Sequence, residues 1–122
     1  MRNHVAKPFF DGSVSNTVKK IVEGAPAELD HLEVSNPAGV DIFLQLFDTA
    51  KASDVTLGGT TPNQSYLIPG GSGGRGAFDR VFVRPMLFEK GLSYAATTGP
   101  ENNVAPASAL TLNAGFLPRG AI

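Results

Sequence analysis

This sequence contains short runs in which apolar and polar residues alternate. Clusters of Gly, Pro and Asn separate these runs. The clearest run is residues 29–35, in which Leu32 and Val34 fall on the same side of an extended chain. A period of two is typical of a strand with one face in a core and one face in solvent. The run ends at Asn36-Pro37-Ala38-Gly39, a sequence rich in residues that favour turns. The pattern therefore predicts short strands joined by turns.

Seven runs are expected to form strands, and a helical alternative is weaker. The one stretch with helical spacing, residues 17–32, is interrupted by Gly24-Ala25-Pro26, and a Pro inside a helix removes a hydrogen bond and clashes with the preceding turn. Short strands at turn-punctuated spacing predict an all-β protein, an antiparallel β-sandwich with either jelly-roll-like or immunoglobulin-like strand order. The expected strands are 13–23, 29–35, 40–47, 65–68, 78–88, 92–97 and 110–112.

The length of 122 residues fits one domain with extended arms at both ends. Residues 1–12 have neither helical nor alternating periodicity and are expected to form an N-terminal arm. Residues 13–114 are expected to form the sandwich, and residues 115–122 a C-terminal tail. The 14 Gly and 9 Pro residues fit a chain rich in turns.

The charge balance argues against an anionic partner. The chain has 10 basic and 11 acidic side chains and a formal net charge of −1, so it has no summed field that would attract nucleic acid or a membrane surface. No apolar run approaches the roughly 20 residues of a membrane helix, and the first residues lack the apolar stretch of a signal peptide. The chain is therefore expected to be made in a cytoplasm and to bind neither nucleic acid nor membrane.

No motif points to catalysis, a cofactor or a metal. Residues 71–76 match G-x-G-x-x-G, but a β-patterned segment follows where a nucleotide site would need a helix, so a flexible loop is expected. His4 and His31 have no repeated spacing that would suit metal ligands. The chain has no Cys and no G-x-S-x-G elbow. We expect a protein that is not an enzyme.

The apolar residues are more informative than the polar ones. In the run 40–47, Phe43 and Phe47 lie on the side opposite to Leu44 and its neighbours, so both sides of this strand are apolar. Either a loop or the chain's own arms cover the second side, or that side packs against another copy or a different partner. The candidate interface residues are Phe9, Phe10, Phe43, Phe47, Phe82, Phe116 and Leu117.

Five segments carry a resemblance to a known family. They are Leu32–Pro37 (LEVSNP), Ile42–Asp48 (IFLQLFD), Val55–Pro62 (VTLGGTTP), Tyr66–Gly71 (YLIPGG) and Phe88–Thr98 (FEKGLSYAATT). Together they resemble a β-sandwich family found in virion proteins of tailed bacteriophages. The similarity spans residues 32–98, while the arms match less well.

The resemblance implies a structural virion protein without catalytic residues. It implies a capsid cement or decoration protein that binds the outer capsid surface and bridges capsomers. Its partners would be the major capsid protein and other copies of itself, as a trimer or alternatively a dimer. The alternative is a receptor- or glycan-binding module of a fibre or tail, with Tyr66, Tyr94 and the loop Gly70–Gly76 as contacts. The absence of Trp weighs against a sugar platform.

Overall fold

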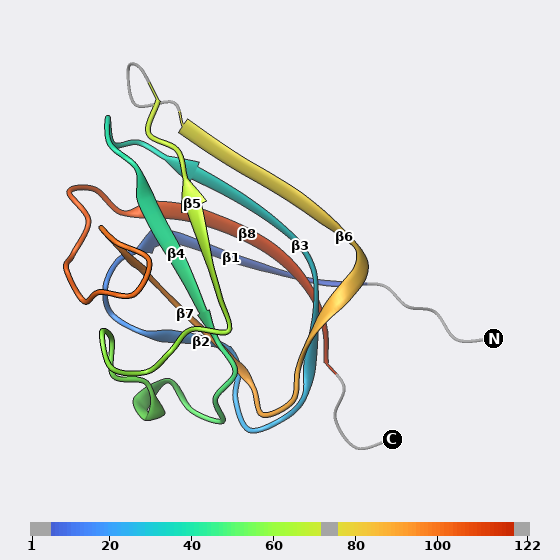
Figure 1. Cartoon of the computed structure of the whole chain (residues 1–122). Coiled ribbons are helices and arrows are strands. Elements are labelled where there is room, and N and C mark those ends of the chain that lie inside the picture. Colours follow the sequence, from blue (N-terminus) through green and yellow to red (C-terminus); the bar gives the residue numbers. More distant parts are fainter. Residues whose placement is uncertain (1–5, 72–75, 119–122) are drawn as a thin grey trace.

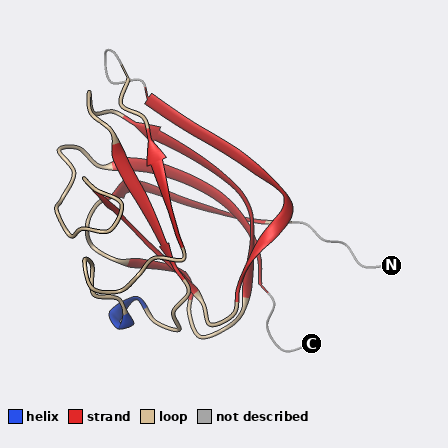
Figure 2. Ribbon diagram, in the orientation of Figure 1, coloured by secondary structure: helices blue, strands red, loops and turns tan. Residues whose placement is uncertain are grey.

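Two antiparallel four-stranded sheets pack face to face in the computed structural model, which describes residues 6–71 and 76–118 (Figures 1 and 2). Sheet A has the strand order β1-β8-β3-β6, and sheet B has the order β2-β7-β4-β5. A single 3₁₀ turn, Ala52–Asp54, is the helical structure among the described residues. The strands are β1 (Lys7–Val14), β2 (Lys19–Val22), β3 (Ala27–Asn36), β4 (Ile42–Phe47), β5 (Gln64–Ile68), β6 (Gly76–Phe88), β7 (Leu92–Thr97) and β8 (Leu110–Pro118).

The strand pairing is that of a jelly roll. The first described strand pairs with the last, β1 with β8, and the pairs β2–β7, β3–β6 and β4–β5 lie successively nearer the middle of the chain. The chain from β1 to β4 changes sheet at every step. In an immunoglobulin-like sandwich the first two strands would lie in the same sheet. The expected all-β sandwich is confirmed, and the strand order is that of a jelly roll.

Most of the expected strands are present, but the first was placed wrongly. Residues 13–23 contain the end of β1, a turn and β2, instead of one strand. The Ser15 hydroxyl accepts a hydrogen bond from the Thr17 amide at 3.3 Å, which gives the backbone a local alternative to the sheet ladder. The chain turns here and crosses from sheet A to sheet B.

The two arms are also shorter than expected, because β1 and β8 pair with each other. Lys7 lies opposite Phe116 and Phe9 opposite Ala114, so residues 7–12 and 115–118 belong to sheet A. Pro8 is compatible with this position because β1 is an edge strand. The remaining parts of the expected arms, residues 1–5 and 119–122, lie outside the described residues.

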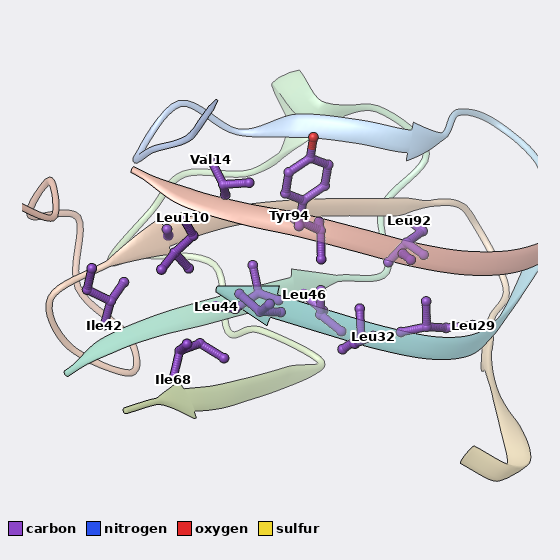
Figure 3. Packing of buried hydrophobic residues seen from close by; sticks show 14 of the residues in the cluster. Val14, Leu29, Leu32, Ile42, Leu44, Leu46, Ile68, Leu92, Tyr94 and Leu110 are labelled. Carbon is purple, nitrogen blue, oxygen red and sulfur yellow. The ribbon is translucent and has the colours of Figure 1, made fainter. Parts of the chain in front are cut away.

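The core between the sheets is built from inward-facing aliphatic side chains of both sheets (Figure 3). Burial of each such side chain contributes about 1.5–3 kcal/mol relative to leaving it in water. Tyr94 is the largest fully buried side chain, and Figure 3 shows its oxygen pointing away from the other labelled residues. Fully buried members are Val14, Leu29, Leu32, Val34, Ile42, Leu44, Leu46, Ile68, Phe88, Leu92, Leu110 and Leu112.

The long edges of the sandwich are closed in two different ways. On the β5–β6 side, Tyr66 and Phe78 stack with ring centroids 5.1 Å apart. On the β1–β2 side, Asp11 of sheet A accepts hydrogen bonds from two groups of sheet B, the Tyr94 hydroxyl at 2.7 Å and the Lys19 ammonium at 3.0 Å. Aromatic packing therefore joins the sheets at one edge, and a polar network joins them at the other.

Candidate partner-binding surface

Part of the outer face of sheet B is covered by the chain's own loops. Gln45 and Phe47 point away from the core, yet neither has exposed surface. The Gln45 side-chain amide donates hydrogen bonds to the Thr97 hydroxyl at 2.6 Å and to the Asn102 carbonyl at 3.1 Å. Asn102 belongs to the segment between β7 and β8, which Figure 1 shows at the side of sheet B that faces away from sheet A.

A second loop, between β4 and β5, meets the first. The Gly58 backbone lies so close to Asn103 that a Cβ built on Gly58 would be 3.8 Å from the Asn103 Cβ. The Ser65 hydroxyl also donates to the Pro100 carbonyl at 2.8 Å. Residues 48–63 and 98–109 thus form a joint cover, called here the loop cover.

The burial of Phe47 distinguishes between the two explanations for the apolar second side of β4. Of the two explanations for the apolar second side of this strand, cover by the chain itself is the one that the structure supports at Phe47, because the ring has no exposed surface. Its expected place in an interface is therefore wrong. Phe43 is half-buried on the same face, opposite Leu67 of the edge strand β5, and Leu67 is 46% exposed.

The outer face of sheet A has a different character. Residues that lie opposite one another in antiparallel strands point to the same side, so the pairing with buried β3 residues fixes which β1, β6 and β8 side chains face out. Three large apolar side chains on this face are at least half exposed: Phe10 at 64%, Val81 at 74% and Leu87 at 50%. Leu117 lies on the same face, opposite Glu28.

Two rings on this face lie beside glycines of sheet A. A Cβ built on Gly115 would collide with the His31 ring, and one built on Gly12 would be 3.3 Å from the Phe10 ring. Because these glycines have no side chain, the rings have room to lie beside the backbone.

The charged residues of this face have one sign. Glu28, Glu33 and Asp79 occupy outward positions fixed by the register, and no Lys or Arg does so among the described residues. Glu33 and Asp79 lie directly opposite each other and are both exposed. Asp30, at the register shift of β3, contacts the His31 ring at 3.4 Å. We call the surface formed by Phe10, His31, Glu33, Asp79, Val81, Leu87 and Leu117 the bare face.

The structure places the other sequence-predicted residues elsewhere. Phe9 faces inward and packs edge-to-face on Tyr94, with ring centroids 5.6 Å apart. Phe116 is half-buried and lies opposite Leu29, a core residue. Phe82 packs against the core, and the Arg80 guanidinium lies 5.8 Å from its ring centroid. Of the seven predicted residues, Phe10 and Leu117 lie on the bare face.

Sequence reasoning missed Val81, Leu87, Glu33 and Asp79. Alternation does place Val81 and Asp79 on the same side of β6, and that signal was available. It does not tell which side of β6 faces the core, since Phe78 and Phe82 are as apolar as Val81. Only the pairing of Asp79 with Glu33, across 46 positions of sequence, settles this direction.

The hydrogen bonds of Asp11 with Tyr94 and Lys19 at the β1–β2 edge stabilise the fold. Burial raises the pKa of the Tyr94 hydroxyl well above its usual range, and its hydrogen bond to Asp11 raises it further. Burial alone would raise the pKa of Asp11, but hydrogen bonds from Tyr94, the Ser13 amide and Lys19 outweigh it, so the pKa is lowered. A tyrosine with a raised pKa stays protonated and donates a hydrogen bond, which holds the edge together.

The contacts expected for a glycan-binding module differ in exposure. Tyr94 is 1% exposed, whereas Tyr66 is half-buried and packs on Phe78. Most of the loop Gly70–Gly76, namely residues 72–75, lies outside the described residues.

Two further properties of the described chain bear on function. Nowhere in residues 6–71 and 76–118 do three or more His, Asp or Glu side chains cluster as metal ligands would. No helix in that part of the chain has the length and apolarity to cross a membrane.

Strand order and surface together define a jelly-roll sandwich with one partly covered and one bare outer face. Comparison with protein-family models, with curated proteins and with solved structures finds no match to this chain.

Proposed function

We propose that this protein is a structural virion protein of a tailed phage, a capsid cement or decoration protein that binds the outer capsid surface and bridges capsomers. Its partners are the major capsid protein and other copies of itself, with a trimer as the favoured assembly. It is made in the host cytoplasm and is not an enzyme.

The observation that carries the proposal is the bare face. Large apolar side chains exposed together on a rigid sheet are a feature of interaction surfaces, and single exposed apolar residues are not. Phe10, Val81 and Leu87 lie on strands of one sheet and not on loops. The opposite outer face supports the proposal by contrast, because there the chain supplies its own cover.

A cement role also fits the size of the domain. One small sandwich offers a limited contact area, so a single contact with a shell would be weak. Many copies that each contact two neighbouring subunits hold a shell through multiplicity, without any strong single contact. A compact β-domain suits this role because it keeps its binding surface preorganised.

The experiment is a binding and counting assay on particles. Heads of the encoding phage, prepared without this protein, are mixed with the purified chain, and bound copies are counted by quantitative mass spectrometry. We expect saturable binding at a stoichiometry comparable with that of the major capsid protein, and greater resistance of the heads to heat. A count of only a few copies per particle would contradict the cement role.

A further inference from the structure

We infer that the bare face docks on a protein surface that is apolar at its centre and carries Lys or Arg at its rim. This inference deepens the proposed function and rests on it, since the partner surface then belongs to the capsid shell. The loop cover lies on the other sheet and takes no part in this contact.

The apolar part of the bare face provides the reason for docking. One row of residues across sheet A takes one residue from each of its four strands. These residues lie opposite one another and are Pro8, Gly115, His31 and Val81. The next row towards the end of β8 contains Leu117, Glu28 and Leu87. Covering these side chains removes apolar surface from water at roughly 25 cal/mol per Å².

The acidic part of the bare face selects the partner. Among the described residues, Glu33 and Asp79 have no ion-pair partner, and they face each other across β3 and β6. Like charges placed directly opposite cost stability, so an external cation that reaches between them is favoured. The formal net charge of the whole chain is only −1, so this acidic pair is a local feature of the bare face.

The same charges disfavour other occupants. A second copy packed on the bare face by its own bare face would bring Glu33 and Asp79 near identical acidic groups, which electrostatic complementarity opposes. An anionic membrane or a nucleic acid would be repelled for the same reason. A protein surface with an apolar centre and Lys or Arg at its rim complements both the apolar and the acidic parts of the bare face.

The first test compares two double variants in the particle-binding assay. Glu33→Gln with Asp79→Asn removes the charge from the bare face and keeps side-chain size. The matched control, Asp54→Asn with Glu101→Gln, removes two exposed charges from the loop cover. All four side chains are exposed, so unfolding midpoints should stay close to that of the unmodified chain.

We expect the bare-face variant to bind heads about tenfold more weakly at low ionic strength and to lose most of the salt dependence of binding. The control should bind like the unmodified chain. If the unmodified chain binds and both variants bind equally well, the inference is overturned and the proposed function stands. If the unmodified chain does not bind heads, the proposed function fails and the inference fails with it.

The second test identifies the neighbour directly. A carbodiimide couples carboxylates to nearby lysines without a spacer, and it is applied to heads carrying the bound chain. Cross-linked peptides that join Glu33 or Asp79 to the major capsid protein support the inference. Cross-links of these two residues to another copy of the chain, or capsid cross-links confined to Asp54 and Glu101, would overturn it.

Discussion

The two outer faces of the sandwich differ in what covers them. On sheet B, outward-pointing Gln45 and Phe47 have no exposed surface, and Gln45 donates a hydrogen bond to Asn102 of the β7–β8 loop. On sheet A, outward-pointing Phe10 and Val81 are mostly exposed. Both faces carry aromatic or aliphatic side chains, so the amino-acid types alone do not separate a buried layer from a binding surface.

The difference lies in the lengths of the connections. The β4–β5 and β7–β8 connections are long enough to fold back over sheet B, and each begins at one of its two central strands. The β2–β3 and β6–β7 turns are short and end at the sandwich edge. No described connection crosses the outer face of sheet A, and this is why its apolar side chains remain available to a partner (Figure 2).

The largest expected effect is on the covered face. Phe47→Ala should lower the free energy of unfolding by about 3–5 kcal/mol, because it leaves a cavity under the loop cover. The matched control, Phe10→Ala on the bare face, should change it by no more than about 0.5 kcal/mol. Urea unfolding measures both, and similar losses for the two variants would show that the faces do not differ as described.

A smaller effect is expected where the loop cover is tied down. Gln45→Leu removes the donor to Thr97 and Asn102 and should cost about 1–3 kcal/mol, because the buried acceptors lose their partner. Amide exchange should become faster in residues 98–109 and stay unchanged in β3. Ser35→Ala, on the exposed side of β3, serves as the control. Unchanged exchange in the loop would mean that this side chain does not hold it.

The edge that joins the two sheets should respond to acid. The folded pKa of Asp11 lies below its ordinary value of 3.8, so the carboxylate stabilises the fold above pH 3.8, and this contribution is lost as the pH falls further through the folded pKa. Asp11→Asn should therefore show a weaker loss of stability than the unmodified chain over this acidic range. Urea unfolding at several pH values measures the difference, and equal slopes would contradict the network.

The smallest effect concerns the bare face alone. Gly115→Ala should displace the His31 ring into solvent and change the unfolding free energy by less than about 1 kcal/mol, because the end of a flexible side chain can move away. The ring signals of His31 in an NMR spectrum would report the displacement. Gly70→Ala is the control, because its Cβ would lie 2.5 Å from the Val40 backbone, which cannot yield as a side chain can. That variant should lose more stability than Gly115→Ala.

The sequence predicted the strands of the middle of the chain better than those at its beginning. Alternation in residues 29–35 located β3, because one side of that strand is core and the other solvent. The strand β1 was missed because Phe9 and Phe10 are both apolar and the register shifts between Asp11 and Val14, which removes any period of two. Pairing of β1 with β8 joins residues between 96 (Val14 and Leu110) and 109 (Lys7 and Phe116) positions apart, beyond any local pattern.

The candidate surface was harder to predict for a related reason. The two-sided apolar character of β4 was recognised, but whether a partner or a loop covers Phe47 depends on where residues 48–63 and 98–109 lie. These segments have no periodicity from which a position could be inferred. The bare face depends on the pairing of β3 with β6 and β8, so its acidic pair became visible only in three dimensions.

The nested pairing of the strands has a consequence for how the chain folds. The innermost ladder joins Leu46 to Gln64, whereas the outermost joins Lys7 to Phe116, so each ladder outward must close a longer loop of chain. Because longer loops cost more entropy to close, we expect β4 and β5 to pair first and β1 and β8 last. Pulse-labelled amide exchange during refolding would reveal this order by late protection of β8. Phe10 would then join the bare face only in the final step, so a partially folded chain would not yet carry a complete docking surface.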